Sequence, residues 1–182
     1  MERTRTLNGE GSLLLLGGGI YSAVAEEIAR EMGSFSRIGV LDDLAQETPL
    51  GTPVLGRMAD LPLFAEEFSH AFVCIGDPEA RLALLRRAEE ASLLPATLVS
   101  PRAFVSPSAW VEAGSAVEPM ATVHALCRVE RGCLICAGAV VNHGAVLEAG
   151  VQVDCNATVP GTVTVPSGTK VAAGTVFCPI HS

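Results

Sequence analysis

The second half of the chain has an apolar residue at every sixth position from Val99 to Phe177. A mostly small residue follows each of these positions four residues later, as Ala121 follows Val117. A helix has a period of about 3.6 residues and a strand a period of about 2, so neither explains this spacing. A six-residue repeat is typical of a parallel β-helix built from hexapeptides. The apolar positions are Val99, Val105, Val111, Val117, Val123, Val129, Ile135, Val141, Leu147, Val153, Val159, Val165, Val171 and Phe177.

Each hexapeptide is expected to form one short strand and one corner. Three hexapeptides close a triangular coil, so residues 18 positions apart in the sequence stack at the strand spacing of about 4.8 Å. The apolar residue then points into the prism, and the small residue sits at the corner, where a bulky side chain would collide with the turn. We therefore predict a left-handed parallel β-helix for residues 96–182.

Residues 1–95 follow a different pattern, in which short apolar runs alternate with helical periods. This alternation predicts a Rossmann-like parallel α/β domain with crossover connections between its strands. The boundary between the two domains is expected near Pro95, where the six-residue rhythm begins. The predicted strands are 13–16, 37–41, 71–75 and 97–99.

Two helices are predicted between these strands. The first follows the glycine turn at residues 17–19 and places Val24, Ile28 and Met32 on one face, with charged residues such as Glu26 between them. The second covers residues 79–90. Each helix therefore connects two parallel strands of the expected sheet.

The turn Gly17–Gly19 lies between a predicted strand and a predicted helix, where backbone amides can approach a phosphate group. The pattern ends at Ser22 and lacks the third glycine of a dinucleotide fingerprint. Asp42 and Asp43 follow the next strand and lie where an acid could bind a ribose or a base. A nucleotide-diphosphate site, an NAD-type site and a tight turn without a ligand all fit this pattern, and the two acids could also serve only as a loop or helix cap.

Composition excludes several kinds of partner. The net charge is −8 and no basic run occurs, so neither nucleic acid nor an anionic membrane is an expected partner. The apolar run at 13–16 is too short to cross a bilayer, and no secretory leader pattern opens the chain. We therefore expect a cytoplasmic protein.

The chain has six cysteines without paired zinc-type spacing. Cys133 and Cys136 form one C-x-x-C pair, but they lie within the repeat, where Cys133 occupies a small corner position. Small buried hydrophobic residues in a reducing compartment explain these cysteines; a metal or redox pair is the alternative. No metal site is predicted.

Several short motifs together resemble the hexapeptide-repeat sugar acyltransferases of bacillosamine, perosamine and sialic-acid biosynthesis. No single motif is specific, but they occur in the family's order along nearly the whole chain. They are the strand with the turn Gly17–Gly19, the run 39–43, the run 51–56, the run 75–77 with Arg81, the hexapeptides, and Asn142–His143.

The resemblance implies an enzyme that transfers an acetyl group from acetyl-CoA to an amine or hydroxyl of a nucleotide-linked amino sugar. It also implies a homotrimer with each active site in the groove between two prisms. The sugar nucleotide is expected on the amino-terminal domain and acetyl-CoA along the β-helix. The residues assigned to the sugar nucleotide are Gly17, Gly19, Tyr21, Asp42, Asp43 and Gly76.

His143 corresponds to the family's general base, which removes a proton from the sugar amine as it attacks the thioester. A histidine with its ordinary pKa near 6.5 is largely a neutral acceptor at cellular pH. Strand alternation from Val141 points His143 inward, but its position at the corner leaves the direction open. One coil away lie Ala125 and Gly161, which are small enough to leave room for a ligand beside the ring.

The other active-site positions depart from the family pattern. Asn142 replaces the acid that usually precedes the base, and Tyr21 replaces a histidine of the glycine turn. Gln152 replaces a histidine that contacts acetyl-CoA, and Cys136 replaces an asparagine. Gly161, where the pantetheine arm passes, is retained.

The cofactor-binding group predicted from the resemblance is therefore Cys136, Gln152, Gly161 and Lys170, with Lys170 as the cation for a CoA phosphate. The closing segment 177–182 is shorter than in the family. Three other functions remain open. The first is a relative that binds a nucleotide sugar without catalysis. The others are acyl transfer to a different acceptor, such as an amino acid or a serine hydroxyl, and nucleotidyl-type chemistry at the glycine turn.

Overall fold

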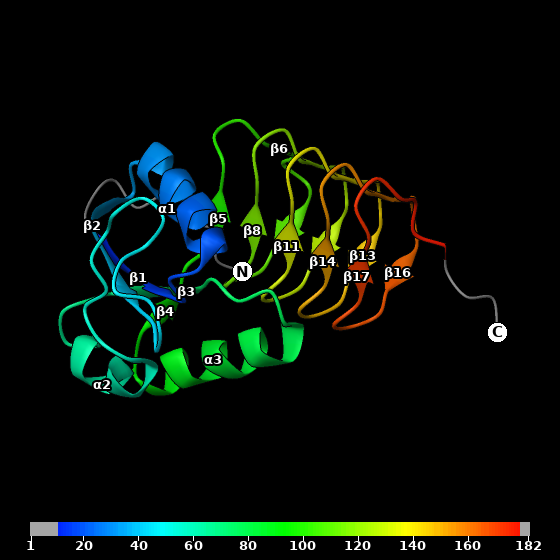
Figure 1. The fold of residues 1–182 in the computed structure, drawn as a ribbon. Helices are drawn as coiled ribbons and strands as arrows, with labels where there is room; N and C mark the ends of the chain where they lie inside the picture. The colour runs from blue at the N-terminus through cyan, green and yellow to red at the C-terminus, as the bar shows by residue number, and fades with distance from the viewer. Residues whose placement is uncertain (1–10, 179–182) are drawn as a thin grey trace. The chain divides into compact units, whose positions relative to one another are not determined.

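The computed structural model describes residues 11–178. Two compact units divide the chain: one contains residues up to Gly76 together with Leu84–Ala96, and the other contains Asp77–Ala83 together with the chain from Thr97. The closing positions Ile180 and His181 lie outside the described residues. Figure 1 labels the elements of both units.

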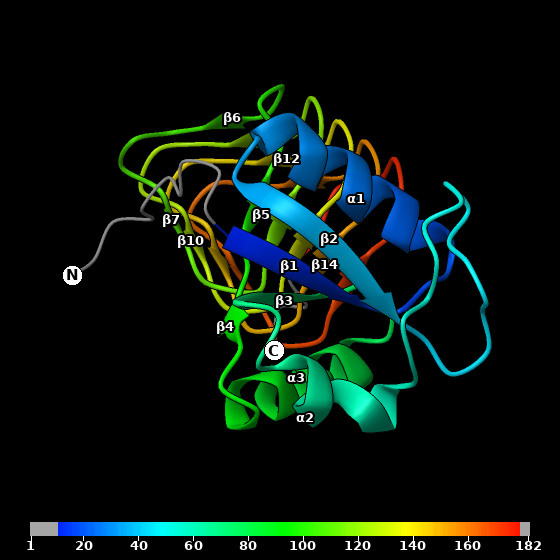
Figure 2. The ribbon, with the colours of Figure 1, turned by 90° about the vertical axis from the view of Figure 1, so that its left-hand side faces the viewer.

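The first unit contains a four-stranded parallel sheet with the strand order β2-β1-β3-β4. One face of the sheet is covered by α1, and the other by α2 and the end of α3 (Figure 2). A buried cluster that includes Leu14, Leu85 and Phe68 joins the sheet to this second layer. The elements are β1 (Gly11–Leu16), α1 (Ile20–Met32), β2 (Phe35–Leu41), a short 3₁₀ turn (Met58–Asp60), α2 (Leu61–Phe64), β3 (His70–Val73), α3 (Pro78–Glu90) and β4 (Leu94–Pro95).

The predicted α/β domain class is confirmed, with three local differences. The fourth strand of the sheet is β4, whereas Leu98–Val99 is the first strand of the β-helix. The short helices between residues 58 and 64 carry no long apolar period and were not predicted. The buried face of α1 differs from the predicted one, because Ile28 is buried but Val24 and Met32 are only half-buried, and the charged Glu26 lies inside.

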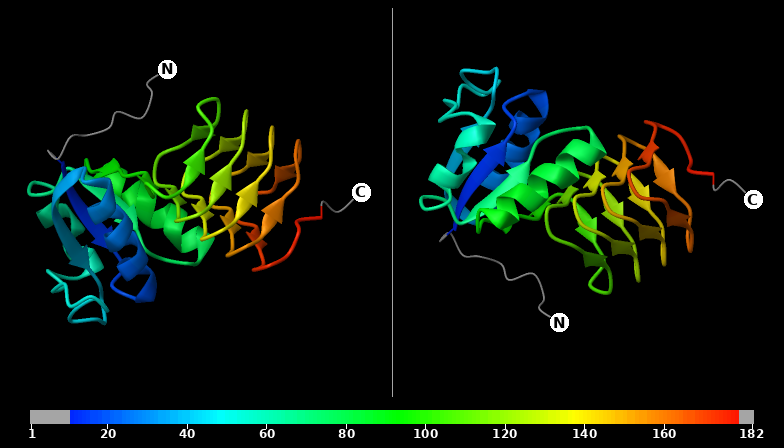
Figure 3. Two further views of the ribbon diagram at one scale, coloured as in Figure 1. Left: turned by 90° about the horizontal axis from the view of Figure 1, so that it is seen from above. Right: turned by 90° about the horizontal axis from the view of Figure 1, so that it is seen from below.

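The second unit is a parallel β-helix, as the six-residue period predicted. Its three sheets have the strand orders β16-β13-β10-β7, β17-β14-β11-β8-β5 and β15-β12-β9-β6. Residues 18 apart are partners, as Ile135 pairs with Val117 and Val153. Figure 3 shows the coils stacked along the prism. The strands are Leu98–Val99, Phe104–Val105, Trp110–Val111, Ala116–Val117, Thr122–Val123, Arg128–Val129, Leu134–Ile135, Val140–Val141, Val146–Leu147, Gln152–Val153, Thr158–Val159, Thr164–Val165 and Lys170–Val171, numbered β5 to β17.

The interior of the prism is one apolar cluster that includes all the predicted sixth-position residues, from Val99 to Phe177. The small residues occupy the corners. At several of these corners the residue has a polar atom that donates to a carbonyl oxygen 15 residues further on; for example, Ser115 Oγ donates to Glu130 O (3.0 Å), and Cys133 Sγ donates to Glu148 O (3.2 Å). These bonds satisfy polar groups that would otherwise be buried without partners.

The first turns of α3 belong to the same unit as the β-helix. The Arg81 side chain is 0% exposed there. Its Nε donates to Gly132 O (2.8 Å) and its Nη2 donates to Gly150 O (2.7 Å). Because these two glycines lie 18 residues apart, one guanidinium joins the same corner of two successive coils.

Candidate functional site

The glycine turn connects β1 to α1 in the first unit. Gly17 has a φ of 116°, and a Cβ there would lie 3.2 Å from Cys74 O, so the position requires glycine. Gly19 is the N-cap of α1 and is exposed, and a Cβ at this position would meet no atom within 4 Å. The turn therefore leaves open space at the helix N-terminus, where an anion can approach backbone N–H groups.

Asp42 connects this turn to the loop that follows β2. Its Oδ2 accepts from Gly18 N (2.7 Å), and its Oδ1 accepts from Leu44 N (2.8 Å) and Ala45 N (2.7 Å). Partial burial acts to raise the pKa of this carboxyl, but the three backbone N–H donors outweigh it and hold the pKa below its ordinary value of 3.8. Asp42 thus acts as a cap that fixes the shape of the turn.

We expect Asp42→Asn to lower the free energy of unfolding at neutral pH by about 1–2 kcal/mol, because the bonds lose their charge assistance and the amide has only one oxygen that can accept where the carboxylate has two. Since the folded-state pKa lies below the unfolded one, this stabilisation is complete above about pH 5, which is about one unit above the unfolded pKa, and is lost as pH falls through the folded-state pKa. Urea titrations from pH 7 to pH 2.5 check this. A difference between wild type and variant that stays constant over this range would contradict the ionised cap.

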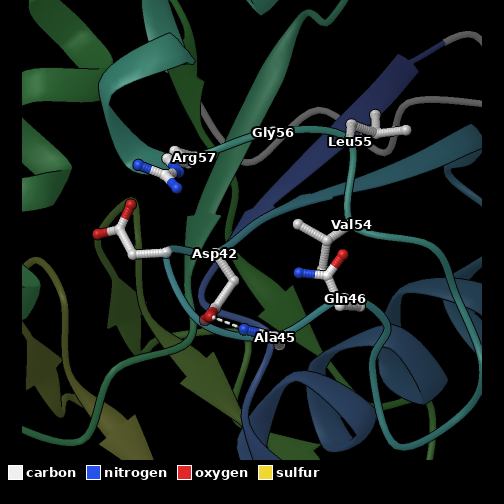
Figure 4. A pocket seen from close by; sticks show the side chains of 8 residues that line it. Asp42, Ala45, Gln46, Val54, Leu55, Gly56 and Arg57 are labelled. Carbon is white, nitrogen blue, oxygen red and sulfur yellow. Dashed lines mark hydrogen bonds between the residues drawn. The ribbon is translucent and has the colours of Figure 1, made fainter.

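A pocket of about 160 Å³ opens beside Asp42 in the same unit (Figure 4). Two of its lining residues, Leu55 and Gly56, are called the pocket floor. They are bonded to the sheet and its edge, because Leu55 N donates to Val40 O (2.9 Å) and Asp42 N donates to Gly56 O (3.1 Å). The Oδ1 atom of Asp43 accepts from Met58 N (3.0 Å). The lining residues are Asp42, Asp43, Ala45, Gln46, Val54, Leu55, Gly56 and Arg57.

The predicted sugar-nucleotide residues all lie at the carboxyl ends of β1, β2 and β3, which are neighbours in the sheet. Tyr21 is half-buried in the first turn of α1, and Gly76 is exposed after β3. Parallel α/β sheets bind ligands in this position, outside the carboxyl ends of their strands. Gln46 and Arg57 were missed as candidates, although the run 51–56 had marked this stretch of the chain.

His143 is exposed and lies at the corner after β12, outside the apolar column. Its ring lies against Gly161 in the next coil: a Cβ on Gly161 would be 2.8 Å from the ring Cε1 and 3.1 Å from each ring nitrogen. The backbone O of His143 accepts from Thr162 N (2.9 Å). The corner thus turns the imidazole outward, and the absence of a side chain at residue 161 makes space for it.

Asn142, the neighbour of His143, is bonded to the next coil. Its Nδ2 donates to Val159 O (3.2 Å), and its own backbone O accepts from the thiol of Cys127 (3.0 Å). The amide therefore fixes the corner on which His143 stands.

The other predicted acetyl-CoA residues meet at Asp154, at the corner after β14. Gln152 Nε2 lies 2.7 Å from Asp154 Oδ1, and Lys170 Nζ lies 3.2 Å from Asp154 Oδ2. The Cys136 thiol, 3.8 Å from Asp154 Oδ1, is buried, and this burial together with Glu118 and Asp154 raises its pKa. Asp154 was not singled out from the sequence, although stacking by 18 places it directly above Cys136.

The predicted β-helix residues thus form two groups, His143 with Asn142 and Gly161, and Lys170 with Gln152 and Cys136. The two groups follow strands of different sheets, β12 and β14. Over residues 11–178, no set of three or more His, Cys, Asp or Glu side chains could hold a metal ion. Within the same range, no helix is long and apolar enough to cross a membrane.

Comparison with known proteins supports the predicted resemblance. Residues 12–88 match the model of the PglD N-terminal domain family. The acetyltransferase domain of PglB from Neisseria gonorrhoeae, solved with acetyl coenzyme A, shares 28% identity at a TM-score of 0.88, over 92% of this chain and 82% of that chain. No sequence match was found among curated proteins.

A second solved structure is a histidine-to-asparagine variant of perosamine N-acetyltransferase from Caulobacter crescentus, in complex with CoA and GDP-perosamine. It shares 28% identity at a TM-score of 0.77, over 93% of this chain and 90% of that chain. The combination of an α/β domain and a parallel β-helix is therefore the architecture of these enzymes. The resemblance to hexapeptide-repeat sugar acyltransferases predicted from the sequence is confirmed.

Proposed function

We propose that this protein is an acetyltransferase that moves the acetyl group of acetyl-CoA to the amine, or a hydroxyl, of a nucleotide-linked sugar. The observation that carries the proposal is the outward-facing imidazole of His143 beside the bare backbone of Gly161. Similarity at 28% identity to enzymes solved with acetyl-CoA, or with CoA and GDP-perosamine, supports it.

His143 acts as the general base in this proposal. The sugar amine attacks the thioester carbonyl carbon, and a ring nitrogen of the neutral imidazole accepts the proton that the amine loses. The tetrahedral intermediate then expels the CoA sulfur, which leaves as the thiol after taking up a proton. No covalent enzyme intermediate is required, because the amine is itself a good nucleophile.

The nucleotide part is assigned to the first unit. The diphosphate would lie at the N-terminus of α1 beside Gly17 and Gly19, with Tyr21 and Gly76 at the edges of this site. The pocket next to Asp42 and Asp43 would receive the nucleoside. Its lining combines apolar side chains with carboxylate, amide and guanidinium groups, which suits a flat base that both donates and accepts hydrogen bonds.

Acetyl-CoA is assigned to the β-helix. The pantetheine arm would pass Gly161, and Gln152 and Cys136 would lie along the next corner. Lys170 is exposed and is paired with Asp154, so a CoA phosphate would have to share or displace that carboxylate.

A homotrimer with the active site between two prisms completes the proposal. Met120 and Leu126 are 72% and 73% exposed, and both have positive φ. The equivalent turn positions in most later coils are glycine. A residue with a side chain is strained at positive φ, so Met120 and Leu126 cost both backbone strain and exposed apolar surface. Burial against a second copy would offset the cost of that exposure. Leu126 lies directly below Gly144, the residue after His143 in the sequence, because stacking is by 18.

A nucleotide-sugar-binding relative without catalysis is the second candidate. Two observations favour it: Asn142 is bonded to the neighbouring coil, and the ammonium group of Lys170 is already paired with Asp154. A neutral amide stabilises a protonated His143 less than a carboxylate would. The pairing of Lys170 with Asp154 weakens its attraction for a CoA phosphate.

The test is a screen of nucleotide-linked amino sugars with acetyl-CoA, followed by release of free thiol. We expect turnover with at least one UDP-, GDP- or dTDP-linked amino sugar, and none without an acceptor. Calorimetry with CoA and with nucleoside diphosphates distinguishes the alternative, which predicts nucleotide binding but no CoA binding. Binding of CoA without any nucleotide binding would instead favour an acceptor of another class.

A further inference from the structure

Glu26 is a buried carboxylate in the middle of α1, only 1% exposed. Its Oε1 accepts from Thr52 Oγ1 (2.7 Å) and from the guanidinium of Arg30 (2.6 and 3.1 Å). Its Oε2 is buried, and no donor among residues 11–178 reaches it. Burying a carboxylate costs free energy unless both of its oxygens are paired. Because only one oxygen of Glu26 is paired among the described residues, the stability of α1 alone does not account for a glutamate at this position.

The hydrogen bond between Thr52 and Glu26 connects α1 to the segment 46–56. This segment supplies four of the eight lining residues of the pocket. The segment is a closed loop, because Thr48 N donates to Thr52 O (2.9 Å), Thr52 N to Thr48 Oγ1 (3.1 Å) and Val54 N to Gln46 O (3.0 Å). In Figure 4 the labelled Gln46 and Val54 come from the two sides of this loop and face the pocket.

The pocket floor is held independently of Glu26. Leu55 N donates to Val40 O, and Gly56 O accepts from Asp42 N, so the sheet fixes the carboxyl end of the segment. Thr52 lies near the tip of the loop, paired with Thr48, and its side chain there reaches the helix. Loss of the Thr52–Glu26 bond would therefore release the tip while the floor and the sheet remain in place.

We propose that Glu26 is a positioning residue that acts through Thr52. It holds the segment 46–56 in the form that gives the pocket its shape, and so determines the affinity for the nucleoside part of the substrate. The identity of the ligand in this inference rests on the proposed function. The ordering of the segment 46–56 by Glu26 is independent of that function.

The test is Thr52→Val, which removes the hydroxyl and keeps the shape of the side chain. We expect the Kd of the nucleoside diphosphate that the wild type binds, from a panel of UDP, GDP, CDP and dTDP, to rise about tenfold. The affinity for CoA should stay unchanged, and Thr52→Ser should restore nucleotide affinity to within about twofold. Unchanged nucleotide affinity in Thr52→Val, or an equal loss of nucleotide and CoA affinity, would overturn the proposal.

Hydrogen exchange gives a readout that needs no ligand. The amides of Thr48, Gly51 and Val54 should exchange about tenfold faster in Thr52→Val than in the wild type. In Thr52→Ser they should exchange at the wild-type rate. The control Ser36→Ala removes a hydroxyl that bonds to Gly11 O and should leave these amides unchanged. If the wild type binds none of the four nucleotides, the proposed function fails, yet amide exchange still decides the positioning role: unchanged exchange in Thr52→Val overturns it.

Discussion

Replacing His143 with alanine should lower kcat by about 10²–10⁴-fold, the contribution of a positioned general base. The imidazole lies outside the apolar column, so its removal leaves the core unchanged, and the melting temperature and elution volume should match the wild type. Release of free thiol from acetyl-CoA with the preferred sugar nucleotide measures kcat. The KM for both substrates should change less than kcat, because the lost interaction forms chiefly in the transition state.

His124 provides a matched control, since it is a second imidazole at a corner of the same column, one coil before Asn142. His124→Ala should keep wild-type turnover. If His143→Ala turns over normally, or if both variants lose activity equally, the assignment of the base is wrong.

Gly161 allows the position of the ring to be tested separately from its chemistry. A methyl group there would lie 2.8 Å from the imidazole Cε1, so Gly161→Ala must shift the ring and should lower kcat. In the His143→Ala background the same substitution should cause little further loss of kcat at saturating acetyl-CoA, because the group that it displaces is gone; any crowding of the pantetheine arm would instead raise the KM for acetyl-CoA. A full additional loss of kcat in the double variant would show that Gly161 does not act through the base.

The β-helix could be predicted from sequence because its rules are local. The period of six fixes which residue points inward, and the three-hexapeptide coil fixes which residues stack. Both follow from side-chain size and strand alternation alone. The stacking of Gln152 with Lys170 was available from the same arithmetic, but the role of Asp154 between them depends on side-chain directions that the period does not specify.

The α/β domain was less predictable at its charged positions. Charged residues in a helix are usually solvated, and Glu26 fitted that pattern, but Thr52 from a distant loop supplies a hydrogen bond that makes its burial possible. His143 illustrates the same limit, because strand alternation points it inward, while the corner and the missing side chain of Gly161 turn it outward. Non-local partners decide both cases.

Arg81 gives the largest expected effect on stability. Arg81→Met should lower the free energy of unfolding by about 2–5 kcal/mol, since two buried carbonyl oxygens, Gly132 O and Gly150 O, lose their charged donor and methionine cannot replace it. For a chain of this size the melting temperature should fall by about 5–15 °C. Arg81→Lys should recover only part of the loss, because an ammonium group is a compact donor without the fork that spans two carbonyls.

Arg81 stabilises the protein by joining two successive coils of the β-helix, so its loss should weaken one identifiable region first. Gly132 and Gly150 occupy the same corner with positive φ, and Pro78 and Leu82 of α3 pack against Gly150. Hydrogen exchange should therefore rise first at the corners around Gly132 and Gly150, before the rest of the prism opens. The exposed Arg86 on the same helix is the control, and Arg86→Met should change stability by no more than about 0.5 kcal/mol. Equal destabilisation by the two variants would mean that α3 needs positive charge in general, and that the bonds from Arg81 to the coils add nothing of their own.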